Sequence, residues 1–165
     1  MRSIFLTLML LTALLVSGSC KHRRGEIAST AFAGDPAFAG HFTSGFYDIE
    51  ANAWRWTNKE FAVTLNPPLH AEERGAQLVM KMAVPDPVVQ HSQSVELSCS
   101  VGGLKLDPQV FSKAGAYTYV RDVPADKLKG RSVRIDFALD HSMPATPPDI
   151  RELGIVVSQV GLVAK

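Results

Sequence analysis

The segment "SVELSCSVGGLKLDP", residues 94–108, decides the fold class of this chain. Apolar residues occupy every second position from Val95 to Val101, and Glu96 or a serine stands at each position between them. Successive side chains of a β-strand point to opposite faces, so this alternation predicts a strand with one buried face. A Gly-Gly pair follows, and the alternation resumes at Leu104, which predicts a β-hairpin.

The same period-two pattern recurs along the chain, and the prolines beyond residue 60 fall between the runs, where they do not interrupt a ladder. No segment of ten or more residues has a helical period, although residues 124–130 can form one turn. About eight short strands predict an all-β fold, a single antiparallel β-sandwich of jelly-roll type. Further strands are expected at residues 60–65, 76–84, 116–123, 132–140 and 153–163. The expected core contains Val95, Leu97, Cys99, Phe61, Val63, Ile135, Phe137 and Trp56.

The N-terminus has the features of a secretory signal peptide over residues 1–19. Arg2 gives a positive start, an uncharged apolar run covers residues 4–16, and small residues follow. The run is shorter than the roughly 20 apolar residues of a membrane-spanning helix, although a retained membrane anchor is the alternative.

The sequence "VSGSC" at residues 16–20 resembles a bacterial lipobox, and this resemblance implies that Cys20 is lipidated and becomes the mature N-terminus. Ser17 stands where that motif prefers leucine, so ordinary cleavage after Ser17 or Ser19 is the alternative. Cys99 is the other cysteine; a Cys20–Cys99 disulfide is a rival interpretation, but the alternation makes Cys99 a small buried side chain.

Residues 20–42 are predicted to be a flexible, lipid-anchored tether, because they are rich in Ala, Gly, Ser and Thr and lack apolar periodicity. Residues 43–165 form the predicted β-sandwich domain. The basic run at residues 21–25 either holds the tether against anionic headgroups or is a solvated linker. The chain is therefore expected to be exported and anchored to a membrane, facing the periplasm or the cell exterior.

The charge of the chain argues against a nucleic-acid partner. Its formal net charge is +1 and the predicted domain shows no basic stripe. No catalytic motif is present, the five histidines have no metal-ligand spacing, and neither a metal nor a cofactor is implied. The chain is predicted not to be an enzyme; the alternative is a hydrolase whose acid–base pair comes from Glu50, Glu60, Asp136 and Asp140.

An aromatic segment at residues 45–66 contains both tryptophans of the chain. The order Gly45-Phe46-Tyr47, Glu50, Arg55-Trp56 and later Asp149-x-Arg151-x-Leu153-Gly154 resembles a bacterial β-sandwich domain of envelope-associated proteins, also found beside polysaccharide-related glycosyltransferases. The resemblance spans residues 45–162 and implies a sandwich like that of carbohydrate-binding modules, without an assigned activity. The connection "IEANAW" is shorter than the Gly-rich connections that the pattern also accommodates.

Glu50, Trp54 and Arg55 are the candidate ligand-binding residues, because an exposed indole stacks on a sugar ring while charged groups hydrogen-bond its hydroxyls. The alternative is structural: Glu50 pairs with Arg55 and both tryptophans cap the sandwich. Asp149 can cap backbone amides, and Arg151 can instead meet Glu50 or Asp48.

The predicted function is therefore that of a non-catalytic envelope lipoprotein with a glycan-binding module. The alternative is a structural or assembly lipoprotein that docks a protein partner through an edge strand or a loop face.

Overall fold

The computed structural model describes residues 29–165. The predicted signal peptide and Cys20 lie outside these residues. Within the described part of the chain, no helix is long and apolar enough to cross a membrane.

Nine strands and four short helical segments make up this part of the chain. The strands are β1 (Thr30–Phe32), β2 (Phe42–Glu50), β3 (Trp54–Leu65), β4 (Ala76–Val84), β5 (Val95–Val101), β6 (Leu104–Phe111), β7 (Gly115–Val123), β8 (Val133–Leu139) and β9 (Val156–Ala164). The helical segments are η1 (Pro36–His41), α1 (Ala71–Arg74), α2 (Asp86–Ser92) and η2 (Ala125–Lys127).

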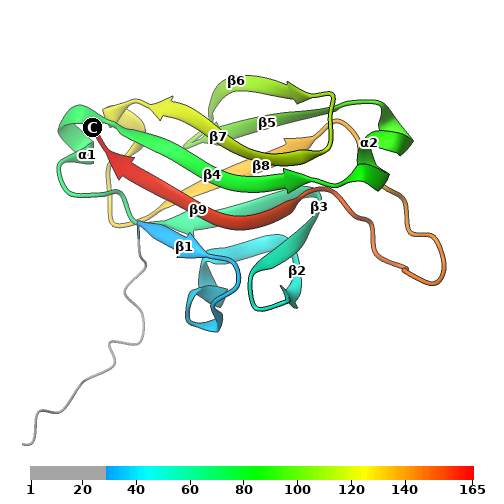
Figure 1. The fold of residues 1–165 in the computed structure, drawn as a ribbon. Helices are drawn as coiled ribbons and strands as arrows, with labels where there is room; N and C mark the ends of the chain where they lie inside the picture. The colour runs from blue at the N-terminus through cyan, green and yellow to red at the C-terminus, as the bar shows by residue number, and fades with distance from the viewer. Residues whose placement is uncertain (1–28) are drawn as a thin grey trace, which may run out of the picture.

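The strands form two layers with jelly-roll connectivity (Figure 1). One layer has the order β1-β9-β4-β7 and the other has the order β3-β8-β5-β6, with β2 added along the free side of β3. Every pairing is antiparallel. The layers join where the start of β3 pairs with β9 through Arg55 and Trp56. The prediction of an all-β, jelly-roll-like sandwich is confirmed.

The inner faces of the layers form one apolar core, built by the alternation that the sequence shows. In β5 the buried positions are Val95, Leu97, Cys99 and Val101. Across the layer, Phe61 of β3 stacks on Phe137 of β8 with ring centroids 5.0 Å apart. Seven of the eight expected core residues are buried. The eighth, Trp56, is partly buried and packs against the core.

The predicted tether is wrong for residues 30–42, which belong to the domain. Thr30–Phe32 pair with β9, and Ala31 is fully buried. His41 is buried as well, and its Nδ1 lies 2.9 Å from the carbonyl oxygen of Thr64. A three-residue strand is too short to show an alternation, so only its pairing with β9 reveals it.

Two local expectations also need correction. Pro108 was expected between strands, but it lies inside β6, an outer strand with one partner. Asp107 and Pro108 stand together opposite the single residue Ser98, which makes a β-bulge where proline is tolerated. Their carbonyl oxygens accept hydrogen bonds of 2.6 and 3.0 Å from the guanidinium group of Arg121 in β7, which ties the outer strands of the two layers together.

The helical segments agree with the sequence in part. The expected turn near residues 124–130 is η2, whereas the sequence pattern does not predict the short helices α1 and α2.

Candidate functional site

The outer face of the β3-β8-β5-β6 layer carries a hollow of about 720 Å³, here called the outer-face hollow. It exists because small side chains occupy the outward positions at its centre. Ser98 of β5 stands opposite Ala138 of β8, and Ser100 stands opposite Asp136. Longer side chains surround this centre: Glu60 opposite Ala138 on β3, Lys105 opposite Ser100 on β6, and Glu96 and Arg134 further along the central strands.

Several of these charged groups are free to bind a ligand. Within residues 29–165, the side chains of Glu60, Glu96 and Lys105 form no ion pair or hydrogen bond. By contrast, Arg134 donates to Asp136 at 2.7 Å. The hydroxyl of Ser98 donates to the carbonyl of Ala138 at 3.1 Å, which leaves its oxygen available as an acceptor. The hollow therefore offers carboxylates, a free ammonium group and hydroxyls over a floor of small residues.

Cys99 lies among the residues of the hollow but its side chain belongs to the core, because it is 4% exposed and points inward. Burial, reinforced by the negative charge of Asp136, raises the pKa of its thiol to about 12. A thiol held in this state is a poor nucleophile, so Cys99 contributes packing rather than chemistry.

The predicted binding residues Glu50, Trp54 and Arg55 lie together at the β2–β3 hairpin. Glu50 and Trp54 stand opposite each other in the pairing, and Trp54 is 36% exposed. Arg55 is used internally: its Nε donates to the carbonyl of Ala33 at 3.1 Å and its Nη1 donates to that of Tyr47 at 2.9 Å. The Glu50–Arg55 pair that the structural alternative required is therefore not formed.

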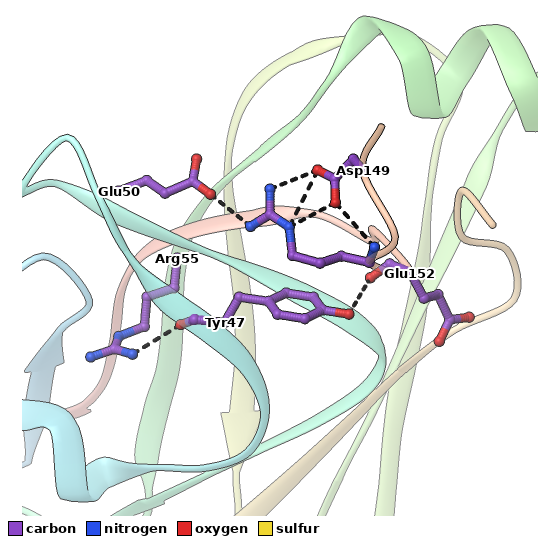
Figure 2. A network of polar contacts seen from close by, with 6 residues as sticks. Tyr47, Glu50, Arg55, Asp149 and Glu152 are labelled. Atoms are coloured by element: carbon purple, nitrogen blue, oxygen red, sulfur yellow. Dashed lines mark hydrogen bonds and ion pairs between the residues drawn. The ribbon is translucent and has the colours of Figure 1, made fainter. Parts of the chain in front are cut away.

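Glu50 instead pairs with Arg151, one of the two partners that the sequence allowed for that arginine. Nη1 of Arg151 donates to Glu50 at 2.7 Å, while its Nε and Nη2 donate to both oxygens of Asp149 at 2.8–3.2 Å. Arg151 thus bridges two carboxylates from distant parts of the chain, and Figure 2 shows Glu50 and Asp149 facing each other across these contacts. Cζ of Arg151 also lies 5.2 Å from the ring centroid of Tyr47. Asp149 accepts the backbone N–H of Arg151 at 3.0 Å, so the predicted capping is confirmed.

These contacts fasten the long loop between β8 and β9 to the β2–β3 hairpin, and we call Tyr47, Glu50, Asp149, Arg151 and Glu152 the loop clasp. The hydroxyl of Tyr47 completes it by donating to the carbonyl of Glu152 at 2.9 Å. Four of the residues that carried the family resemblance, Tyr47, Glu50, Asp149 and Arg151, thus meet in space, and the contacts among them are structural. They hold a loop in place.

The loop clasp makes the stability of the domain dependent on pH. Hydrogen bonds from Arg151, first from its side chain and then from its backbone, lower the pKa of Asp149 from 3.8 to about 2. The carboxylate therefore stabilises the fold above pH 4, and this contribution is lost as the pH falls through about 2.

Asp149→Asn should lower the urea midpoint of unfolding at pH 6. The difference in urea midpoint between this variant and wild type should nearly disappear near pH 2, because the wild-type carboxylate is then losing its charge. The matched control is Asp48→Asn, an exposed carboxylate without a partner in the described chain; an equal effect of both substitutions would contradict this role.

Sequence reasoning did not identify the outer-face hollow. The sequence names two of its residues, Glu60 and Asp136, only as carboxylates of the alternative hydrolase, and the others only as polar positions of β-strands. Nothing in the alternation of a strand distinguishes a hollow from an ordinary solvated face. Trp54 lies six residues before Glu60 on β3, about 20 Å along the strand, so the predicted tryptophan and the hollow are separate. Among residues 29–165 no group of three or more His, Cys, Asp or Glu side chains could hold a metal ion.

Comparison with known proteins assigns no family to the chain. No protein-family model and no curated protein matches the sequence. Among solved structures, the chain is similar to the CBM36-1 domain of a multidomain xylanase from the hindgut metagenome of Trinervitermes trinervoides. The TM-score is 0.38 at 8% identity, covering 66% of this chain and 73% of that domain. A likeness at this level transfers neither a fold family nor a ligand.

Proposed function

We propose that this domain is a non-catalytic carbohydrate-binding module of the cell envelope and that a glycan binds in the outer-face hollow. The observation that carries the proposal is the combination of a floor of small residues with unpaired charged groups around it. Carboxylates, ammonium groups and serine oxygens hydrogen-bond the hydroxyls of a sugar, and charge-assisted bonds are the stronger ones. The volume of about 720 Å³ is in the ordinary range for ligand sites.

The affinity is expected to be modest. The hollow contains no exposed aromatic ring, so hydrogen bonds must supply most of the binding free energy. Four to six such bonds, each with a net contribution of about 1 kcal/mol, correspond to dissociation constants of about 0.05–1 mM. Millimolar titrations are therefore required.

The test is isothermal titration of the domain with soluble envelope and cell-wall oligosaccharides, followed by variants of the hollow. Glu60→Gln and Lys105→Ala should each weaken binding about tenfold, because each loses a charge-assisted hydrogen bond. Ser98→Tyr should abolish binding by filling the floor, and Ser98 is exposed, so the fold tolerates the ring. Glu72→Gln, an exposed carboxylate on α1, is the matched control. If Trp54→Ala removes binding and the hollow variants do not, the hairpin is the site and the proposal fails.

The proposal includes lipid anchoring at Cys20, which lies outside the described residues and is supported by the signal-peptide and lipobox patterns of the sequence alone. Mass spectrometry of the mature protein should find residue 20 first and acylated. An unmodified N-terminus, or one that begins after Cys20, would contradict the anchor while leaving the glycan proposal intact.

A further inference from the structure

The two ends of the sandwich differ, and the chain enters at one of them. The backbone N–H of Leu162 donates to the carbonyl of Ser29 at 2.7 Å, and Ala164 pairs with Ala76 directly after α1. Helix α1 also packs against η2. Figure 1 shows α1 and the C-terminus at this end, whereas α2 and the β8–β9 loop lie at the other. We call the first the chain-entry end.

A leucine projects from the chain-entry end. Leu69 is 81% exposed and follows Pro67 and Pro68, whose rings fix the local backbone. The N–H of Ala71 donates to the carbonyl of Pro68 at 3.1 Å, so Leu69 occupies the tip of a tight turn. At the opposite end Ile150 is 79% exposed, which provides a natural comparison.

The balance of charged groups around the two residues differs. Three exposed cations lie near Leu69 and make no ion pair within the described chain: Arg74, Lys129 and Arg131. Lys129 and Arg131 come shortly before Val133, which pairs with Leu65 at the base of the turn that carries Leu69. Glu72, Glu73 and Asp126 partly offset them, and Asp126 is itself paired with Lys127 at 3.3 Å. The end that carries Ile150 has six acids: Asp48, Glu50, Asp86, Asp140, Asp149 and Glu152. Arg151 pairs with Glu50 and Asp149, and Asp140 lies 2.9 Å from Nδ1 of His141, so Asp48, Asp86 and Glu152 are the acids there without an ion pair in the described chain.

The length of chain before the domain favours one orientation on a membrane. Eight residues separate Cys20 from Ser29, so the chain between these two residues reaches at most about 30 Å. Ser29 lies beside Leu162, which pairs with Leu78, so β4 extends about 20 Å beyond Ser29 to Val84. Helix α2 and the β8–β9 loop lie beyond that end of β4. With the far end on the bilayer, the connecting chain would have to extend over most of its reach, which costs conformational entropy.

From these observations we infer that the chain-entry end contacts an anionic bilayer, with Leu69 at the headgroup–acyl boundary and Arg74, Lys129 and Arg131 over the lipid phosphates. This inference rests on the membrane attachment in the proposed function. It leaves the outer-face hollow on the side of the molecule and the β8–β9 loop pointing away from the membrane. An exposed leucine by itself is ordinary on a protein surface. Its position beside the chain entry and the unpaired cations distinguishes it from Ile150.

The test uses the full lipidated protein on vesicles, with an environment-sensitive fluorophore on Leu69→Cys or on the control Ile150→Cys. The buried thiol of Cys99, with its raised pKa, should not react, and mass spectrometry verifies single labelling. On phosphatidylcholine vesicles containing phosphatidylglycerol, the probe at residue 69 should shift to the blue and the probe at residue 150 should not. Lys129→Glu combined with Arg131→Glu should remove the shift, because each cation near the anionic surface favours the contact about fivefold in its equilibrium constant. The control Lys113→Glu, at the far end, should leave the shift unchanged.

Each outcome has a separate meaning. If the protein is bound to the vesicles but neither probe shifts, or only the probe at residue 150 shifts, the inferred orientation is overturned and the anchor stands. If the protein does not associate with vesicles at all, the anchor and the orientation both fail. Glycan titration remains independent of either result.

Discussion

Gly45→Ala should destabilise the domain by at least about 3 kcal/mol, measured as the free energy of unfolding in urea. Gly45 has a φ of +71°, and a Cβ built there would clash with the carbonyl oxygen of Glu60 and lie 2.7 Å from the Cα of Phe61. Both are backbone atoms of β3, so no side chain can move aside. Relief requires β2 to separate from β3, which would also weaken the loop clasp on the same hairpin.

Substitutions at three other glycines separate the cost of a positive φ from the cost of a steric clash at the new Cβ. Gly40 has neither a positive φ nor any atom within 4 Å of a built Cβ, and Gly103 has a φ of +79° but no close atom. Gly154 has no positive φ, but its Cβ would meet the side chains of Leu139 and Thr57 at 2.6 and 2.7 Å. Alanine should be near neutral at Gly40, cost about 1 kcal/mol at Gly103, and cost more at Gly154. An effect at Gly45 no larger than that at Gly103 would show that the close approach of β2 to β3 is absent.

Phe137→Ala should cost about 3–5 kcal/mol of the free energy of unfolding, a large fraction of the roughly 5–15 kcal/mol of an ordinary domain. The ring is 3% exposed in the middle of the β3-β8-β5 layer and stacks on Phe61. Its loss removes apolar burial and leaves a cavity between strands that are held by their neighbours. Thermal and urea unfolding, followed by far-ultraviolet circular dichroism, measure the change.

The matched control is Phe32→Ala, which removes the same side chain from a position that is 47% exposed on β1. Phe32 has one edge-on ring contact, with Phe38 at 5.5 Å, so its loss should cost about 1 kcal/mol. Similar losses for the two phenylalanines would mean that the inner face of β8 is not the core of the sandwich.

The strands and the core residues were predictable from the sequence because period-two alternation is a local property. The predicted range 76–84 coincides with β4, and the hairpin at the Gly-Gly pair joins β5 to β6 as expected. Burial of alternate side chains holds wherever the strand finds its partner, so Leu97 and Ile135 could be assigned to the core without knowing the pairing. The alternation in β5 and β8 therefore determined both the fold class and the inner face.

What the tertiary structure alone decided is the pairing of side chains that lie far apart in the sequence. Glu50 stands five residues from Arg55 and 101 from Arg151, yet it binds Arg151, because the β8–β9 loop returns to the hairpin while Arg55 faces the carbonyls of Ala33 and Tyr47. The outer-face hollow has the same origin. Ser98, Ala138 and Glu60 come from three strands, and only their antiparallel register places small residues side by side with unpaired charges around them. Alternation specifies which face of a strand is polar, but the shape of that face depends on its neighbours, and the order of the strands is a property of the whole chain.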